Sequence, residues 1–123
     1  MRRVLMVCTG NTCRSVMAAG LLQKRAQEAG LDIKVESAGL AAFVGDAATV
    51  PTENVMGEIG VDVRQHRSRR VQQPLLDEAD IVFVMTEAHR QQLLTMFGWE
   101  YAPKVQLLQA YAGSLVHGAE NTR

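Results

Sequence analysis

Cys8 and Arg14 are the residues of this chain whose types and spacing could perform chemistry together. They open and close the segment "CTGNTCR", which follows the apolar run "VLMV". A cysteine thiolate is a strong nucleophile, and a guanidinium is a planar fork that can bind two oxygens of a phosphoryl group. The pair predicts attack of Cys8 on phosphorus while Arg14 holds the phosphoryl oxygens, followed by hydrolysis of the phosphocysteine by water.

The segment that contains this pair is typical of a loop that binds an anion. It joins the end of a predicted strand to the start of a predicted helix, where unpaired N–H groups and the helix dipole favour negative charge, including a thiolate at Cys8. Gly10 and Asn11 are expected to supply left-handed backbone angles. Ser15 could cap the helix or donate a hydrogen bond to the Cys8 sulfur. The predicted phosphate-binding residues are Thr9, Gly10, Asn11, Thr12, Cys13, Arg14 and Ser15.

The predicted chemistry needs no cofactor and no metal ion, because backbone amides and Arg14 can neutralise the phosphoryl oxygens. The two cysteines, Cys8 and Cys13, do not make a closed zinc site by themselves. The loop also lacks the lysine and the second glycine of the common nucleotide-binding loop.

Strand and helix patterns alternate along the chain. Short apolar runs predict strands at 4–7, 33–37, 80–85 and 104–108, and helical spacing predicts helices at 15–29, at 48–59 and between Thr86 and Gly98. This alternation predicts an α/β fold, a three-layer sandwich with a four-stranded parallel sheet flanked by helices. Ligands bind beyond the carboxyl ends of such strands, which is where the first strand reaches Cys8.

The size and charge of the chain exclude several classes of protein. At 123 residues and 47% hydrophobic, residues 1–123 fit one domain. Thirteen basic residues balance thirteen acidic ones, which argues against a nucleic-acid-binding surface, so "RQHRSRR" (64–70) is interpreted as a solvated or site-flanking loop. We find no signal peptide and no apolar run long enough to span a membrane, and we expect a cytoplasmic protein. These features predict no oligomeric state.

The stretch "VCTGNTCRS" resembles the signature of the low-molecular-weight protein tyrosine phosphatase family. Three later blocks resemble family segments in the same order: "VESAGL", "GEIGVDVRQHRSRR" and "ADIVFVMTEAHR". The resemblance implies a phosphatase that acts on phosphorylated proteins, with inorganic phosphate or sulfate as simpler ligands of the loop. It implies that Cys8 is the nucleophile and Arg14 the phosphate-binding cation. It also implies a supporting polar network of Asn11, Ser15, Ser37 and His66, and a reversible disulfide between Cys8 and Cys13.

The resemblance leaves the substrate open between phosphotyrosine and phosphoarginine. Tyrosine phosphatases of the family commonly have Ile or Leu where this chain has Thr12, and "CTGNTCRS" is more similar to the bacterial branch that acts on phosphoarginine. Phe43 could form an aromatic wall of the pocket or could pack in the interior.

The chain departs from the family at two places. Val16 stands where the family usually has proline, which should cost some rigidity. The Asp-Pro pair that supplies the general acid, and the final helix, are missing after "YAG", and general acid–base help is worth about 10²–10⁴-fold. His117 and Glu120 are conceivable substitutes, and the chain could be naturally short, truncated, or part of a longer product. A phosphate-binding module with little turnover, or an arsenate reductase using an external thiol, are the alternative functions.

Overall fold

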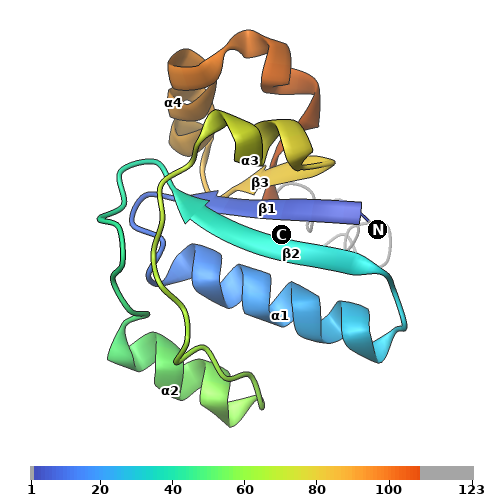
Figure 1. Ribbon diagram of the computed structural model, residues 1–123, viewed down its shortest axis with the longest axis vertical. Coiled ribbons are helices and arrows are strands. Elements are labelled where there is room, and N and C mark those ends of the chain that lie inside the picture. The colour runs from blue at the N-terminus through green and yellow to red at the C-terminus, as the bar shows by residue number, and fades with distance from the viewer. Residues whose placement is uncertain (1, 109–123) are drawn as a thin grey trace, which may run out of the picture.

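A computed structural model describes residues 2–108 of the chain (Figure 1). Its centre is a four-stranded sheet in which every neighbouring pair is parallel and the order is β2-β1-β3-β4. The strands are β1 (Arg2–Cys8), β2 (Ile33–Gly39), β3 (Ile81–Val84) and β4 (Val105–Leu107). The predicted α/β fold and all four predicted strands are confirmed.

Helices cover both faces of the sheet. They are α1 (Arg14–Glu28), α2 (Val50–Glu58), α3 (Gln73–Glu78) and α4 (Glu87–Phe97), followed by a 3-10 helix, η1 (Trp99–Lys104). Figure 1 shows α1 and α2 on one side of the sheet and α3 and α4 on the other, which gives the expected three layers. No helix among residues 2–108 is both long enough and apolar enough to cross a membrane.

The apolar run at the start of the chain becomes the central strand because both of its faces are buried. Leu5 and Val7 face the core under α3 and α4, whereas Val4 and Met6 face the cluster under α1. A strand that alternates between two cores needs apolar residues at every position, as this one has. Burial on both faces therefore explains why "VLMV" is continuous rather than alternating.

The carboxyl ends of the three neighbouring strands lie side by side. Cys8 pairs with Gly39 of β2, and Val7 pairs with Val84 of β3. The loop after β1 therefore starts between the segments that follow β2 and β3, where parallel sheets form their binding sites.

Most helix boundaries follow the capping signals of the sequence. The side chains of Thr49 and Thr86 accept hydrogen bonds from the first turns of α2 and α4, and Gly30, Gly60 and Gly98 have positive φ after helix ends. The helix predicted at 15–29 is confirmed as α1, within which Leu21 is 41% exposed.

Two short elements were not predicted. Helix α3 has six residues and begins with a proline in its first turn, and η1 also has six residues. Six residues cover less than two turns of an α-helix and only two turns of a 3-10 helix, too few to show a hydrophobic period.

Candidate active site

Residues 8–15 form the loop between β1 and α1, and we call them the phosphate loop. The sulfur of Cys8 lies 3.0 Å from the Ser15 hydroxyl oxygen and 3.4 Å from the backbone nitrogen of Asn11. The Asn11 N–H donates to the sulfur, and the Ser15 hydroxyl can donate to it once the thiol has lost its proton. Two donors at the sulfur stabilise a thiolate.

Asn11 holds the loop in shape. It is fully buried and has a φ of 58°, a left-handed angle that asparagine tolerates better than most residues. Its side-chain amide donates to the hydroxyls of Ser15 and Ser37, with a distance of 2.9 Å in both cases. Its Oδ1 accepts from the Arg69 backbone N–H at 3.0 Å. His66 Nε2 donates to the Asn11 carbonyl at 2.7 Å. The structure thus brings together the four residues that the resemblance implied: Asn11, Ser15, Ser37 and His66.

One expectation for this loop was wrong, and one of the two roles considered for Ser15 is excluded. Gly10 does not have a positive φ, and a Cβ added there would only reach ordinary contact with Thr12 Oγ1 at 3.7 Å, so no packing reason for glycine is visible. Ser15 does not cap the helix, because α1 already begins at Arg14 and no side chain caps it. The buried Ser15 hydroxyl faces the sulfur instead, which is the other role considered for it.

The residues nearer the mouth of the loop are accessible. Cys13 and Arg14 are exposed, Thr12 is half-buried, and Cys8 is 3% exposed. The Arg14 side chain makes no hydrogen bond or ion pair with another residue of the described part of the chain, so its guanidinium is available to a ligand. Both thiols are free in this structure, and the disulfide stays a prediction.

The segment after β2 runs along the phosphate loop and is fastened to it by backbone hydrogen bonds. Leu40 N–H donates to the Cys8 carbonyl at 2.9 Å, and Ala41 N–H donates to the Thr9 carbonyl at 3.0 Å. This approach requires glycine at position 39, because a Cβ there would lie 2.5 Å from the Thr9 carbonyl oxygen. Gly39 is a functional position that the sequence reasoning missed.

Phe43 lies further along the same segment and is 78% exposed, so the packing role considered for it is wrong. Its carbonyl accepts a hydrogen bond from the hydroxyl of Ser68, which in turn accepts from the Asp46 N–H at 2.8 Å. The buried Ser68 therefore fixes the backbone that presents Phe43 to solvent. Its role as a pocket wall stays a prediction.

The sequence analysis did not predict two further residues of the site, Arg69 and His89. Arg69, besides its backbone contact with Asn11, donates from its guanidinium to the Ser37 carbonyl at 3.0 Å and to Glu36 Oε2 at 3.1 Å. On the other side, His89 Nε2 lies 2.8 Å from the Thr9 hydroxyl oxygen. One signal could have revealed His89: it precedes Leu93 by four residues, on the buried stripe of α4.

The environment of His89 opposes a charge on its ring. Burial, and then the positive charge of Arg14, lower the pKa of His89 from its ordinary value of 6.5. The imidazole is therefore neutral near pH 7.

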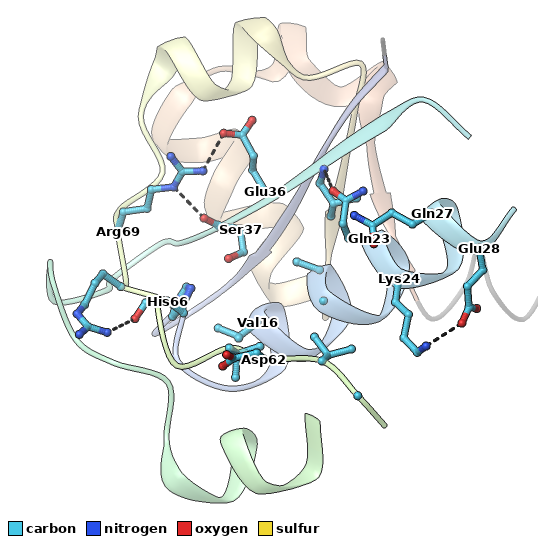
Figure 2. A pocket seen from close by; sticks show the side chains of 17 residues that line it. Val16, Gln23, Lys24, Gln27, Glu28, Glu36, Ser37, Asp62, His66 and Arg69 are labelled. Atoms are coloured by element: carbon cyan, nitrogen blue, oxygen red, sulfur yellow. Dashed lines mark hydrogen bonds and ion pairs between the residues drawn. The ribbon is translucent and has the colours of Figure 1, made fainter. Parts of the chain in front are cut away.

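A cavity among the described residues lies behind the phosphate loop rather than over Cys8. It has a volume of about 750 Å³, runs along α1 beside β2, and is lined by Ser37 and His66 but by none of residues 8–15 (Figure 2). Ion pairs stand along its walls, among them Lys24 with Glu28 and Arg69 with Glu36 (Figure 2). An anion site made of loop amides is a smaller concavity than this.

Some expectations fall outside the described residues. The stretch "YAG", after which the Asp-Pro pair is missing, and the suggested substitutes His117 and Glu120 lie in residues 109–123. Within residues 2–108, no group of three or more His, Cys, Asp and Glu side chains is placed to hold a metal ion.

The chain is similar to proteins that are named phosphatases. The chain is 37% identical over 108 residues to a protein-arginine-phosphatase of Bacillus subtilis, covering 88% of this chain and 71% of that protein. It is 41% identical over 95 residues to the protein-arginine-phosphatase of Geobacillus stearothermophilus, covering 77% of this chain but only 62% of that protein. The matched part of the chain therefore spans about two thirds of the length of these relatives.

Solved structures agree with the fold. A YwlE arginine phosphatase mutant with a phosphorylated active-site serine matches with a TM-score of 0.86 at 34% identity, over 91% of this chain and 72% of that one. A low molecular weight protein tyrosine phosphatase from T. tengcongensis matches with a TM-score of 0.87 at 36% identity, over 92% and 77%. The sequence model of the family described as "Low molecular weight phosphotyrosine protein phosphatase" matches residues 3–120. The chain therefore belongs to the low molecular weight phosphotyrosine protein phosphatase family.

Proposed function

We propose that this chain is a cysteine-dependent phosphatase that hydrolyses phosphorylated side chains of proteins. The observation that carries the proposal is the Cys8 sulfur, which lies at the end of β1 within 3.0 Å of the Ser15 hydroxyl and 3.4 Å of the Asn11 amide. Its relatives are named protein-arginine-phosphatases, and the related mutant with a phosphorylated active-site serine supports transfer of the phosphoryl group to a protein side chain.

The proposed reaction has two steps. The Cys8 thiolate attacks phosphorus, an S–P bond forms, and the P–O bond of phosphotyrosine or the P–N bond of phosphoarginine breaks as the leaving group takes a proton from solvent water. Water then attacks the phosphocysteine, inorganic phosphate leaves, and the thiolate returns. Arg14 and the loop amides bind the phosphoryl oxygens in both steps. Ser15 and the Asn11 amide stabilise the thiolate when it is released.

The burial of Cys8 limits how a substrate can reach it. Since the residue is only 3% exposed, the phosphoryl group must enter the phosphate loop itself. A phosphorylated side chain that protrudes from a protein surface or a peptide meets this requirement.

We propose phosphoarginine as the preferred substrate and phosphotyrosine as the alternative. The names of the two relatives above favour phosphoarginine. Thr12 is half-buried in the loop, and a small, partly polar side chain suits a polar guanidinium better than an aryl ring. The cytoplasmic location also stays a prediction.

Initial rates on matched phosphoarginine and phosphotyrosine peptides test the proposal, with and without a C-terminal segment that carries an Asp-Pro pair. Cys8→Ser should abolish turnover and keep phosphate binding, and Arg14→Lys should lower turnover, because a point charge cannot replace the guanidinium fork. Gln92→Ala, which changes an exposed residue of α4, is the control. Turnover by Cys8→Ser equal to wild type refutes the mechanism. Phosphate binding without phosphoryl transfer, even with the added segment, identifies a binding module instead.

A further inference from the structure

His89 is a buried polar side chain that contacts the phosphate loop and has no part in the mechanism above. It stands in the first turn of α4 and is 6% exposed. Its Nε2 lies 2.8 Å from the Thr9 hydroxyl oxygen, and Thr9 directly follows the nucleophile. The ring therefore reaches the loop from the β3 side of the sheet, opposite the side from which Ser37 and His66 reach it.

The surroundings of the ring determine which of its nitrogens carries the proton. Nδ1 is buried and has no hydrogen-bond partner among residues 2–108. A buried N–H without an acceptor is rarer and costlier than a lone pair without a donor. The proton of the neutral ring therefore lies on Nε2, and Nε2–H donates to the Thr9 oxygen.

This direction determines what the Thr9 hydroxyl can do. Its oxygen accepts from His89, so its own proton turns away from the ring. Thr9 is exposed, unlike His89, and its proton is therefore available to a guest of the phosphate loop. A hydroxyl oriented in this way is a fixed donor on the residue that directly follows the nucleophile.

We propose that His89 is a positioning residue of the reaction, which holds the Thr9 hydroxyl as a hydrogen-bond donor to the phosphoryl group in the loop. The expected effect on turnover rests on the proposed function. The expected effect on phosphate affinity requires only that the loop binds an anion. Burial keeps the ring neutral. A neutral ring that has its proton on Nε2 and none on Nδ1 can only donate to Thr9, so the Thr9 hydroxyl proton turns away from the ring.

Four variants test the inference. His89→Met removes the donor and keeps an apolar side chain of similar length, and His89→Gln restores an N–H near the position of Nε2. Thr9→Val removes the hydroxyl at equal size, and the fourth variant combines Thr9→Val with His89→Met. We measure kcat and KM on an aryl phosphate, the affinity for inorganic phosphate by calorimetry, and stability in urea.

We expect His89 and Thr9 to contribute to kcat/KM and phosphate affinity through the same hydrogen bond, so that their losses do not add. His89→Met and Thr9→Val each lower kcat/KM and phosphate affinity about fivefold to tenfold, the effect of one hydrogen bond. The double variant loses no more than Thr9→Val alone, and His89→Gln recovers most of the loss. Losses that multiply in the double variant overturn the inference, as does a Gln variant no better than Met at equal stability.

Thr9→Val keeps the test decisive if His89→Met does not fold, because wild-type kinetics and phosphate affinity in Thr9→Val alone overturn the inference. The two proposals also fail separately. Absence of turnover together with the expected pattern in phosphate affinity removes the phosphatase function and keeps the role of His89. Normal turnover that none of the four variants changes removes the role of His89 alone.

Discussion

Replacement of Asn11 should affect both the stability of the protein and its turnover, and three variants can separate the two effects. Its side chain makes three hydrogen bonds, its backbone makes two more contacts with Cys8 and His66, and it has a φ of 58°. Asn11→Gly removes the three side-chain bonds and tolerates the backbone angle. Asn11→Ala removes the same hydrogen bonds, and the alanine must also adopt the left-handed φ of 58°. Asn11→Asp keeps the shape, replaces the amide donors with acceptors and adds a negative charge.

The structure gives the expected magnitudes. A buried hydrogen bond contributes about 1 kcal/mol, so Asn11→Gly should lower the free energy of unfolding by about 3 kcal/mol. Asn11→Ala should lose about 1–2 kcal/mol more, because an alanine in the left-handed region is strained. Asn11→Asp should lose least, because the hydroxyls of Ser15 and Ser37 can turn to donate to its carboxylate.

Activity should follow a different order from stability. In Asn11→Asp, the Ser15 proton turns from the Cys8 sulfur to the new carboxylate, and a negative charge stands beside the thiolate. A hydrogen bond to a charged group is worth about 1.5–3 kcal/mol, so kcat/KM should fall roughly 10- to 100-fold in a variant that is nearly as stable as wild type. Urea denaturation and initial rates on an aryl phosphate measure the two effects. An Asn11→Asp variant with wild-type kcat/KM, or an Asn11→Gly variant within about 1 kcal/mol of wild type, would falsify this reasoning.

Two shorter predictions concern Gly39 and His89. Gly39→Ala should cost about 1–3 kcal/mol and reduce turnover, because its Cβ would lie 2.5 Å from the Thr9 carbonyl. Gly57→Ala in α2 is the matched control and should stabilise the protein by about 0.5–1 kcal/mol, since a Cβ there meets nothing within 4 Å; equal denaturation midpoints for the two would contradict this account. The pKa of His89 is lowered in the folded protein, so its contribution to stability is full above pH 6.5 and is lost as the pH falls from there toward the lowered pKa. His89→Gln should therefore lose less stability than wild type on acidification, and parallel curves would show that His89 does not titrate in this way.

The sequence predicted the sheet well because its strands are defined by local patterns. The run from Val4 to Val7 is apolar at every position, and only a strand buried on both faces requires that. Helical spacing predicted α1 correctly, but it does not tell which apolar residues the neighbouring elements cover, and Leu21 of this helix is exposed.

The site was predictable where its residues are consecutive. The spacing of Cys8 and Arg14 indicated an anion-binding loop, and the family resemblance added Ser37 and His66. Gly39 was missed, because its requirement comes from a backbone carbonyl thirty residues earlier in the chain. Such a close approach exists only after β1 and β2 have paired.

The phosphate loop is supported from two sides, and the two supports should act independently. Asn11 is held from the β2 side by Ser37, and Thr9 is held from the β3 side by His89. The two pairs share no hydrogen-bond partner among the contacts described above. The losses in the free energy of unfolding of Ser37→Ala and His89→Gln should therefore add within about 0.5 kcal/mol in the double variant. A larger deviation would mean that the loop moves as one rigid unit, so that loosening either side already releases the other.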